Sequence, residues 1–428
     1  IRPPMGFNNW YEMPLQYPPW RHGFNESELV RVAMTLVSSG LRDRGYKVVT
    51  LDCGWSTGYR TRAGRLQVNS TLFPSAAEGN SLRPLSDELG RMGLDLGIYT
   101  SGKQCCGPAD RTDGSEGHED ADAEQFAEWG IKFVKDDDCG SSAAHFRRFS
   151  AAILRNRSAP MIYFIHSPWT HNNASHPSPA ESVAIANAAR TSNDNKPEWS
   201  AILGRARQNN AFAALARPGF HNDANMMEVG NGNLTAAESR SHFALCASVA
   251  CRRKLLHSTV HLCYTQTAIA SSSPYYDQQQ RARLVTAGCV MRSPLTISTD
   301  ISRATADTLS TLGHEELIAV NQDPLPTPAR LIERTQRQRE GPGLTPAFDA
   351  WVGPLHDNCS VALVVNLGSA ALRERLQFGA DLRLQLATYR VRDLWGRRDL
   401  GVMRAGIDLG VEEAHDNALY KICPLTVH

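Results

Sequence analysis

Short apolar segments recur along the first three quarters of the chain, and a polar or helix-forming stretch follows each of them. Strand-length segments that alternate with amphipathic helices, such as Glu28–Ser39 and Ala121–Trp129 here, are typical of parallel β/α units. The eight strand-like segments are Met5–Asn8, Tyr46–Asp52, Leu94–Thr100, Ile131–Asp137, Met161–His166, Ala186–Arg190, Phe220–Asp223 and Pro294–Thr299. The pattern therefore predicts an α/β fold, a closed (β/α)8 TIM barrel, over residues 1–325.

Polar side chains stand at the C-terminal ends of most of these segments. They are Asn8-Asn9-Trp10, Asp52-Cys53, Thr100-Ser101, Lys135-Asp136-Asp137, His166-Ser167, Arg190 and Asn222-Asp223. In a barrel these ends converge on one face, which is the usual rim of an active site. Three consecutive acids, Asp136 to Asp138, resist burial because like charges repel. A solvated turn after the strand is the alternative interpretation of this segment.

The pattern changes after Leu325, where shorter alternating segments are separated by Gly, Asn and charged turns. They are Ala347–Trp351, Ser360–Val365, Leu384–Arg390, Asp399–Met403 and Ile407–Gly410. This alternation predicts a C-terminal antiparallel β-sandwich over residues 326–428, which a Cys359–Cys423 disulfide could staple.

The segment from about residue 246 to 287 fits the barrel pattern poorly. It holds basic, Ser-rich and Gln-rich pieces where one helix should link the seventh and eighth strands. We interpret it as an atypical insertion, either a surface excursion or a gene-model error such as a retained intron.

Composition argues against nucleic-acid binding and membrane insertion, and it favours secretion. The net charge of +1 gives no footprint for nucleic acid or an anionic membrane, and the apolar runs are too short to span a bilayer. The chain begins at Ile1, which suggests a processed mature form, and it contains ten cysteines. Candidate N-glycosylation sites are Asn25, Asn69, Asn156, Asn173, Asn233 and Asn358. Together these features predict a secreted eukaryotic glycoprotein with disulfides. Its cysteines lack the spacing of a structural zinc site.

Several ordered motifs resemble glycoside hydrolase family 27 of clan D, the α-galactosidases and α-N-acetylgalactosaminidases, and in particular its fungal-type members. The matching segments are Pro4–Trp10, Leu51–Trp55, Gly97–Tyr99, Gly114–Glu119, Phe126–Gly130, Glu228–Gly232 and Ile318–Leu325. The resemblance implies a (β/α)8 barrel with a C-terminal antiparallel β-domain. It also implies a retaining exo-α-glycosidase, most simply an α-galactosidase, that acts on terminal α-linked galactose of oligosaccharides or polysaccharides.

The same resemblance assigns the two catalytic carboxyls. The family's lysine–aromatic–Asp–x–Cys motif places the nucleophile at Asp137, with Asp136 in the position of the aromatic residue. The family's Trp-Arg-x-x-x-Asp motif places the acid/base at Asp194. Retention requires the two carboxyls about 5–5.5 Å apart, and the reaction needs no metal or organic cofactor. We expect Lys135 to keep Asp137 ionised and the pKa of Asp194 to be raised.

The resemblance further implies a sugar site. Trp10 would be a stacking platform, Asp52 would bind sugar hydroxyls, and Cys105 would pair with Cys139, for which Cys106 is a rival partner. The substrate-binding candidates are Trp10, Asp52, Cys53, Tyr99, Cys105, Lys135, Ser167, Arg190, Asn225 and Met226.

Four departures from the family pattern affect the predicted specificity. Cys53 replaces one of two aspartates that grip the 4- and 6-hydroxyls, and Ser167, within His166–Trp169, replaces a glutamate that reads the 2-position. Asn225 replaces a pocket aspartate, and Ala189 replaces a tryptophan. α-N-Acetylgalactosaminidase and β-L-arabinopyranosidase activities therefore remain alternatives within the family. A catalytically weak sugar-binding homologue is the alternative from another class.

Overall fold

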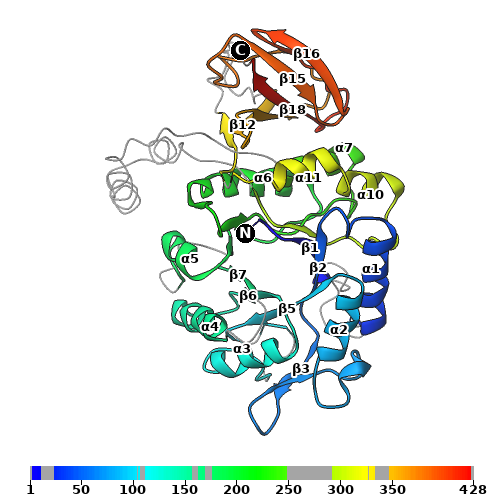
Figure 1. Ribbon diagram of the computed structural model, residues 1–428, viewed down its shortest axis with the longest axis vertical. Coiled ribbons are helices and arrows are strands. Elements are labelled where there is room, and N and C mark those ends of the chain that lie inside the picture. The colour runs from blue at the N-terminus through cyan, green and yellow to red at the C-terminus, as the bar shows by residue number, and fades with distance from the viewer. Residues whose placement is uncertain are drawn as a thin grey trace.

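The computed structural model describes residues 2–10, 24–103, 105–106, 111–156, 162–168, 176–247, 292–325, 327–332 and 347–425. Two bodies are evident, a barrel in which helices surround a sheet and a smaller β-domain at one end of it (Figure 1). Most of the predicted insertion, residues 248–287, lies outside the described residues, and Cys246 and Ala247 form the end of helix α7.

The barrel sheet consists, in the described ranges, of eight parallel strands in the order β10-β1-β2-β5-β6-β7-β8-β9. Their bounds are β1 Met5–Asn8, β2 Tyr46–Leu51, β5 Asp95–Ser101, β6 Phe133–Asp137, β7 Tyr163–Ser167, β8 Ala188–Arg190, β9 His221–Asp223 and β10 Leu295–Ile297. Each falls within one or two residues of a predicted segment, so the sequence-based prediction of the fold class is confirmed.

The sheet curls so far that its two edges meet just beyond β9. Met227 donates its N–H to the carbonyl of Thr296 at 2.7 Å, and Ser298 donates its N–H to the carbonyl of Met227 at 3.2 Å. Met227 thus forms a parallel bridge with Ile297 of β10. This contact joins the segment after β9 to β10, the strand at the other edge of the sheet, and leaves no long open edge between them.

Helices cover the outside of the sheet (Figure 1). Their bounds are α1 Glu26–Ser38, α2 Arg83–Arg91, α3 Glu119–Glu128, α4 Ala143–Arg155, α5 Pro179–Ile185, α6 Trp199–Asn210, α7 Ala236–Ala247, α10 Ala306–Leu312 and α11 Glu315–Asn321. Single 3₁₀ turns occur at Pro74–Ala76 and Ala213–Leu215. Helix α1 begins with a capping box in which Asn25 and Glu28 bond each other's backbone, which fixes its start. Helix α4 begins at the Ser142 cap, directly after the end of β6.

A short hairpin, β3 Ser56–Arg60 and β4 Leu66–Val68, follows β2 and was not expected from the sequence. Strand β3 carries Ser, Thr, Gly and Arg without an apolar alternation, and β4 alternates (Leu66, Gln67, Val68) over only three residues, too few to predict a strand. Arg60 nevertheless anchors the hairpin, because its guanidinium bonds both oxygens of the buried Asp122 at 2.7 Å.

The C-terminal domain contains, among the described residues, a six-stranded antiparallel sheet in the order β11-β12-β13-β18-β15-β16. These strands are β11 Arg330–Ile332, β12 Phe348–Pro354, β13 Ser360–Asn366, β18 Asn417–Pro424, β15 Thr388–Asp393 and β16 Arg398–Arg404. The pair β14 Arg375–Gln377 and β17 Gly406–Asp408 contributes to the apolar cluster under this sheet. The antiparallel domain and its Cys359–Cys423 disulfide are as predicted, whereas β18 in the middle of the sheet was not expected.

The two bodies share a buried interface. Trp351, Leu363 and Leu419 of the β-domain belong to the same apolar cluster as the barrel helices. At its rim, His415 stacks on Trp199 of α6 with ring centroids 5.1 Å apart. The exact boundary between residues 325 and 326 stays a prediction.

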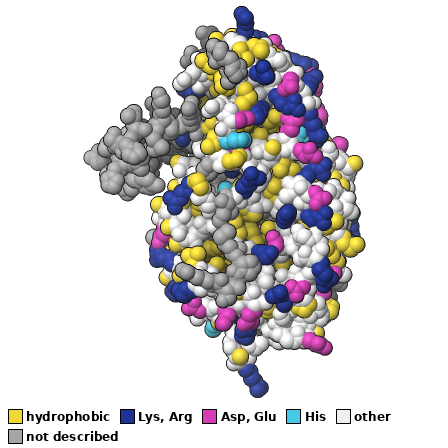
Figure 2. All heavy atoms as spheres, in the orientation of Figure 1, with side chains coloured by type: hydrophobic (Ala, Val, Ile, Leu, Met, Phe, Trp, Pro, Cys, Tyr) yellow, Lys and Arg dark blue, Asp and Glu magenta, His cyan; other side chains and the backbone are white. Residues whose placement is uncertain are grey.

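The surface carries charges of both signs. Lys and Arg side chains are interspersed with Asp and Glu side chains on the face in view (Figure 2). Within the described ranges, every helix is too short or too polar to cross a membrane.

Candidate active site

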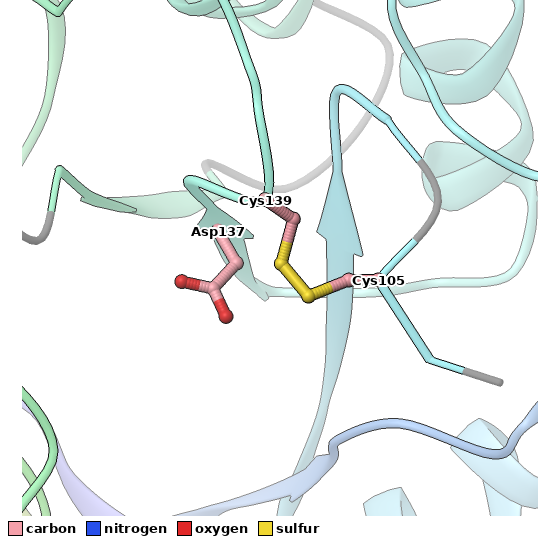
Figure 3. A group of neighbouring side chains, drawn as sticks. All are labelled: Cys105, Asp137 and Cys139. Carbon is pink, nitrogen blue, oxygen red and sulfur yellow. A yellow bond between two sulfur atoms is a disulfide. The ribbon is translucent and has the colours of Figure 1, made fainter. Parts of the chain in front are cut away.

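The three consecutive acids at the end of β6 are held by different partners. Asp136 and Asp137 are 0% and 7% exposed, so this segment is not the solvated turn that was the alternative. His145 of α4 lies 3.1 Å from Asp136, and His176 lies 2.7 Å from Asp138. Side chains alternate across a strand, so Lys135 and Asp137 share one face and Asp136 lies on the other. The carboxylate of Asp137 points from the end of β6 into the mouth of the barrel (Figure 3).

Asp52, directly after β2, forms hydrogen bonds with residues at the ends of β1, β2 and β6. Its Oδ2 atom accepts hydrogen bonds from Lys135 Nζ and from Asn8 Nδ2, each at 2.8 Å. Its Oδ1 atom accepts from the Cys53 N–H at 3.0 Å, and its own N–H donates to Asn9 Oδ1 at 2.7 Å. The fully buried Asp52 is therefore rigidly oriented by residues from β1, β2 and β6.

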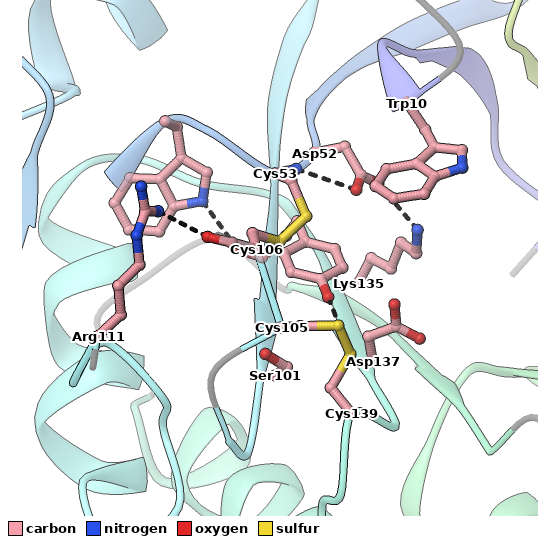
Figure 4. The surroundings of a disulfide bond; sticks show 12 residues. Trp10, Asp52, Cys53, Ser101, Cys105, Cys106, Arg111, Lys135, Asp137 and Cys139 are labelled. Atoms are coloured by element: carbon pink, nitrogen blue, oxygen red, sulfur yellow. Dashed lines mark hydrogen bonds and ion pairs between the residues drawn. A yellow bond between two sulfur atoms is a disulfide. The ribbon is translucent and has the colours of Figure 1, made fainter. Parts of the chain in front are cut away.

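Two aromatic rings flank the ammonium group of Lys135. Its Nζ atom lies 5.1 Å from the centroid of Tyr99 and 5.9 Å from the centroid of Trp10, within the range of cation–π attraction. Burial lowers the pKa of Lys135, but the negative charges of Asp52 and Asp137 outweigh burial and the pKa is raised. Lys135 therefore stays charged, and Figure 4 shows it between Trp10, Asp52 and Asp137.

Asp194 reaches the same region from the loop after β8. Arg190, which is 2% exposed, donates from Nη2 to Asp194 Oδ1 at 3.0 Å. Asn225 Nδ2 donates to the same oxygen at 3.4 Å. The Asp194 side chain is 42% exposed, so it stands at the open edge of the site. Asn225 has a positive φ of 90°, which aims its amide at Asp194 while Met226 beside it is buried.

The electrostatics of the two carboxyls differ from the sequence-based expectation. Burial raises the pKa of Asp137 and the charges of Lys135 and Arg190 only partly offset it, so this pKa is raised. Burial also acts on Asp194, but the charges of Arg190 and Lys135 outweigh it and its pKa is lowered. The expectation of a raised pKa at Asp194 is therefore wrong, because Arg190 and Lys135 stabilise its ionised form more than burial disfavours it. At Asp137, Lys135 favours the ionised form as expected but does not outweigh burial.

Two disulfides fix the loop after β5. Cys105 bonds to Cys139 and its neighbour Cys106 bonds to Cys53 (Figure 4). The pairing implied by the family resemblance is present, and the rival partner Cys106 has a partner of its own. Cys53 and Cys105 therefore offer no free thiol, and any contact with a sugar would be through the disulfide.

The sulfurs of Cys105 and Cys139 and a carboxylate oxygen of Asp137 lie within 4.8 Å of one another. Thiolates at this spacing would suit a soft metal ion, but disulfide sulfurs carry no charge and do not act in that way. This group is therefore a carboxylate packed beside a disulfide (Figure 3).

Ser167 ends β7 directly beside Asp137 in the strand register. Its hydroxyl is buried and forms no hydrogen bond with any part of the chain that the structure describes. A buried hydroxyl without a partner is costly unless a ligand satisfies it, so Ser167 is suited to receive a polar group of a ligand. Trp169, next in the same loop, lies outside the described residues.

Sequence reasoning missed the groups that orient the carboxylates. Asn8 and Asn9 were noted only as polar strand ends, although their amides hold Asp52. His145 and His176 were not considered. The signal available for them was indirect, because three consecutive acids at a buried strand end require nearby cations.

A (β/α)8 barrel with buried carboxyls at the C-terminal strand ends, joined to an antiparallel β-domain, is the architecture that the sequence resemblance to glycoside hydrolases implies. A family model described as "Alpha galactosidase A" matches residues 2–272. A second model, described as "Alpha galactosidase C-terminal beta sandwich domain", matches residues 345–422. The chain belongs to the α-galactosidase family, glycoside hydrolase family 27.

Individual relatives agree with this assignment. Alpha-galactosidase 2 of Arabidopsis thaliana is 29% identical over 402 residues, which cover 92% of this chain and 83% of the relative. The alpha-galactosidase of Coffea arabica is 29% identical over 431 residues, covering 99% of this chain and 94% of the relative. The structure of alpha-galactosidase I from Mortierella vinacea superposes with a TM-score of 0.77 at 24% identity, covering 98% of this chain and 96% of that one. The fold is also shared with a family 27 β-L-arabinopyranosidase from Geobacillus stearothermophilus, with a TM-score of 0.74, 19% identity, and coverage of 99% and 96%.

Proposed function

We propose that this protein is a retaining exo-α-glycosidase that releases terminal α-linked D-galactose from oligosaccharides or polysaccharides. The observation that carries the proposal is the placement of Asp137, buried at the end of β6 with Lys135 beside it, near the more exposed Asp194. Relatives that are named α-galactosidases support the choice of sugar.

In the first step an oxygen of Asp137 attacks the anomeric carbon while the bond to the leaving group breaks. Asp194 gives its proton to the departing oxygen, and a glycosyl ester of Asp137 forms. In the second step Asp194 takes a proton from water, whose oxygen attacks the anomeric carbon and breaks the ester. Two inversions give net retention of configuration, and a carboxyl separation of about 5–5.5 Å stays a prediction.

Each flanking group has a role in this proposal. Trp10 would stack against the apolar face of the sugar ring, and Tyr99 would close the same side. Asp52 and Lys135 would bind hydroxyls as a fixed ion pair, and Arg190 would bind both the sugar and Asp194. In the proposed mechanism, all catalytic and sugar-binding groups are amino-acid side chains of this protein.

The lowered pKa of Asp194 has a consequence for pH. Asp194 must carry a proton to start the reaction, and Arg190 favours the form without it. Asp137 must be ionised at the same time, and burial raises its pKa. The active protonation state therefore becomes rarer both at low pH, where Asp137 is protonated, and at high pH, where Asp194 is ionised, so we expect a bell-shaped pH profile with its maximum in acidic solution.

The test is hydrolysis of nitrophenyl α-D-galactoside, α-N-acetylgalactosaminide and β-L-arabinopyranoside by the wild-type protein, Asp137→Ala and Asp194→Ala. We expect the wild-type protein to hydrolyse the galactoside and Asp137→Ala to have no activity on it. Asp194→Ala should retain more activity on nitrophenyl substrates than on natural oligosaccharides, because nitrophenolate leaves without a proton. Galactose binding by a folded wild-type protein that turns over none of the three would contradict an enzymatic role and favour a sugar-binding homologue.

A β-L-arabinopyranosidase is the second candidate, and the state of Cys53 favours it. Cys53 stands where the family has a carboxylate that grips the 4- and 6-hydroxyls, and its sulfur is bonded to Cys106. L-Arabinopyranose is galactose without the CH2OH arm, so a weaker grip at this point costs it less. A larger kcat/KM for the arabinopyranoside than for the galactoside would establish this alternative. Ser167 replaces the glutamate that reads the 2-position in the family, so α-N-acetylgalactosaminidase activity stays an alternative. The N-acetylgalactosaminide in the same assay tests it.

We further propose that the protein is secreted and N-glycosylated. The described residues contain three disulfides, which persist in oxidising compartments. Among the candidate acceptors, Asn233 and Asn358 are exposed and Asn25, Asn69 and Asn156 are half-buried, while Asn173 lies outside the described residues. Peptide mass spectrometry of the protein from its native source before and after glycan removal tests each position. The proposed partner is a saccharide, with no role for nucleic acid or a membrane.

A further inference from the structure

Asp136 points away from the mouth of the barrel into the layer between the sheet and helices α3 and α4. It is 0% exposed, in a layer where apolar side chains normally pack. The Nε2 atom of His145, also 0% exposed, lies 3.1 Å from one Asp136 oxygen and 3.2 Å from the other. The imidazole ring stacks on Phe149 with centroids 5.6 Å apart. Burying an ionisable pair in this layer costs free energy, so its presence calls for a specific role.

The contacts continue from His145 to the surface. His145 Nδ1 lies 3.1 Å from Glu119 Oε1 at the start of α3, and Arg148 donates from Nε to the same oxygen at 2.8 Å. The charges alternate in sign along this row, so each group is next to an opposite charge. Burial lowers the pKa of His145, but Asp136 and Glu119 outweigh burial and raise it to about 9, which keeps the ring positively charged at neutral pH.

Other charges near this row are paired elsewhere or lie at its outer end. Asp122 of α3 is bonded by Arg60 of the β3–β4 hairpin. Glu116, in the loop before α3, lies 3.7 Å from Arg148 and accepts a short hydrogen bond from Ser142. The charges that face the His145 ring directly are therefore Asp136 from β6 and Glu119 from α3.

The Asp136–His145 contact closes a loop of the chain. Asp136 immediately precedes Asp137, and His145 lies in the first turn of α4, nine positions further on. The connecting segment contains Cys139 at a φ of 28°, a conformation that residues other than glycine seldom adopt. Ser141 Oγ also donates to the Asp137 carbonyl at 2.8 Å, which ties the segment from inside. An uncommon backbone conformation persists only when its surroundings fix it, and the contact between β6 and α4 supplies that restraint at its two ends.

We propose that Asp136, His145 and Glu119 form a buried clasp that positions the carboxylate of Asp137 for attack. We define the clasp by these three residues, which are positioning residues and do not touch the substrate. The proposal rests on the proposed function, because it assigns Asp137 as the nucleophile. A displacement of a reacting group by about 1 Å can cost roughly 100-fold in rate, so a restraint on this loop would act mainly on kcat.

The first experiment compares His145→Gln and Asp136→Asn with Asp122→Asn. Asp122→Asn is the matched control, because Asp122 is equally buried and paired with one cation but lies outside the clasp. We expect the two clasp variants to lose roughly 10- to 100-fold in kcat with KM within about threefold, and the control to keep its kcat. Amide hydrogen exchange of residues 136–142 should become faster in the clasp variants and not in the control. Clasp variants with unchanged kcat and unchanged exchange would overturn the proposal.

The double variant Asp136→Leu/His145→Leu separates positioning from stability. Apolar replacement of a buried ion pair is often neutral or stabilising, so this protein should fold even if a single variant does not. We expect a thermal midpoint close to that of the wild type and a kcat still lowered roughly tenfold or more. A wild-type kcat in the folded double variant would show that the charged contacts serve packing alone. If the wild-type protein hydrolyses no glycoside, the proposed function fails, and the exchange of residues 136–142 still tests the clasp.

Discussion

Nη2 of Arg190 lies 3.0 Å from Oδ1 of Asp194, and the charge of Arg190, together with that of Lys135, outweighs burial and lowers the pKa of Asp194, which was expected to be raised. Arg190 is buried and always charged, so it stabilises the ionised form of Asp194 in the free protein. The pH dependence of hydrolysis should therefore report on Arg190.

We expect Arg190→Met to move the alkaline limb of kcat/KM to higher pH, because Asp194 keeps its proton longer without the neighbouring cation. The maximal kcat/KM should fall roughly 10- to 150-fold, as expected for one lost charge-assisted hydrogen bond of about 1.5–3 kcal/mol. Arg190→Lys is the control, since it keeps the charge and should leave the limb near its wild-type position. Identical pH profiles for wild type and Arg190→Met would show that Asp194 is not the group that titrates.

Asp52→Asn should lower kcat/KM roughly 10-fold or more, because Lys135 loses the carboxylate that orients it and keeps it charged. The matched control is Asp95→Asn, which breaks the Asp95–Lys132 pair at the opposite end of the neighbouring strand. Both members of that pair are at least one third exposed, so the change in activity should be small. Steady-state kinetics on one nitrophenyl glycoside compares the two variants, and equal losses would contradict a special role for Asp52.

Stability should depend on pH through the clasp. The pKa of His145 is raised to about 9, so its contribution is fully present below about pH 6.5 and is lost as pH rises through 9. Burial acts to raise the pKa of Glu119, but hydrogen bonds from Arg148 and from backbone N–H groups lower it to about 2. That contribution is present above about pH 4.5 and is lost as pH falls through 2.

The measurement is the free energy of unfolding in urea between pH 5 and pH 10, for the wild type and for His145→Gln. The difference between the two proteins should shrink as pH approaches 10, because the wild-type ring then loses its charge. A difference that stays constant over this range would indicate that His145 is neutral in the folded protein.

The interface between the two bodies should depend on Arg240. Its guanidinium bonds Asp416 at 2.6 Å and Glu413 at 2.8 Å, both from the loop before β18. We expect Arg240→Ala to lower the free energy of unfolding by about 1–3 kcal/mol, since Asp416 is left with little solvent. Arg373→Ala, which breaks a pair more than 60% exposed on both sides, should change it by less than about 0.5 kcal/mol. Urea denaturation of both variants makes the comparison, and equal effects would mean that the loop before β18 contributes nothing specific.

The sequence predicted the barrel well because most of its strands are short apolar runs that end in polar residues, whereas β9 is His-Asn-Asp preceded by the apolar Phe220. In β6, for example, Phe133 and Val134 are apolar and buried, and they mark the strand before its charged end. The hairpin β3–β4 could not be predicted in the same way, because β3 is mostly polar, β4 has only three residues, and the anchor Arg60 bonds Asp122 across 62 positions of the chain. Strand β18 was missed because Lys421 interrupts the apolar pattern, although Lys421 is paired with Asp357 and so is tolerated there.

In the candidate site, too, some features could be predicted from the sequence and others depend on the folded structure. Motif spacing led to Asp137 and Asp194, whereas the directions of their pKa shifts depend on the balance between burial and the charges of Lys135 and Arg190, which is a property of the folded chain. The disulfides illustrate this limit as well, because the neighbours Cys105 and Cys106 are equally able to reach Cys139 in the sequence. Only the geometry of the strand ends assigns Cys106 to Cys53.

These neighbouring cysteines also decide how the protein can be produced. The two Cα–Cα separations, 5.5 Å and 5.4 Å, are ordinary for disulfides, and exchanging the partners would shift each crosslink by only one residue. Such an isomer would be compact and yet carry a displaced loop beside Asp137. Expression in a reducing bacterial cytosol is therefore a poor choice, whereas a host compartment that supplies both an oxidant and a disulfide isomerase allows the correct pairs to accumulate.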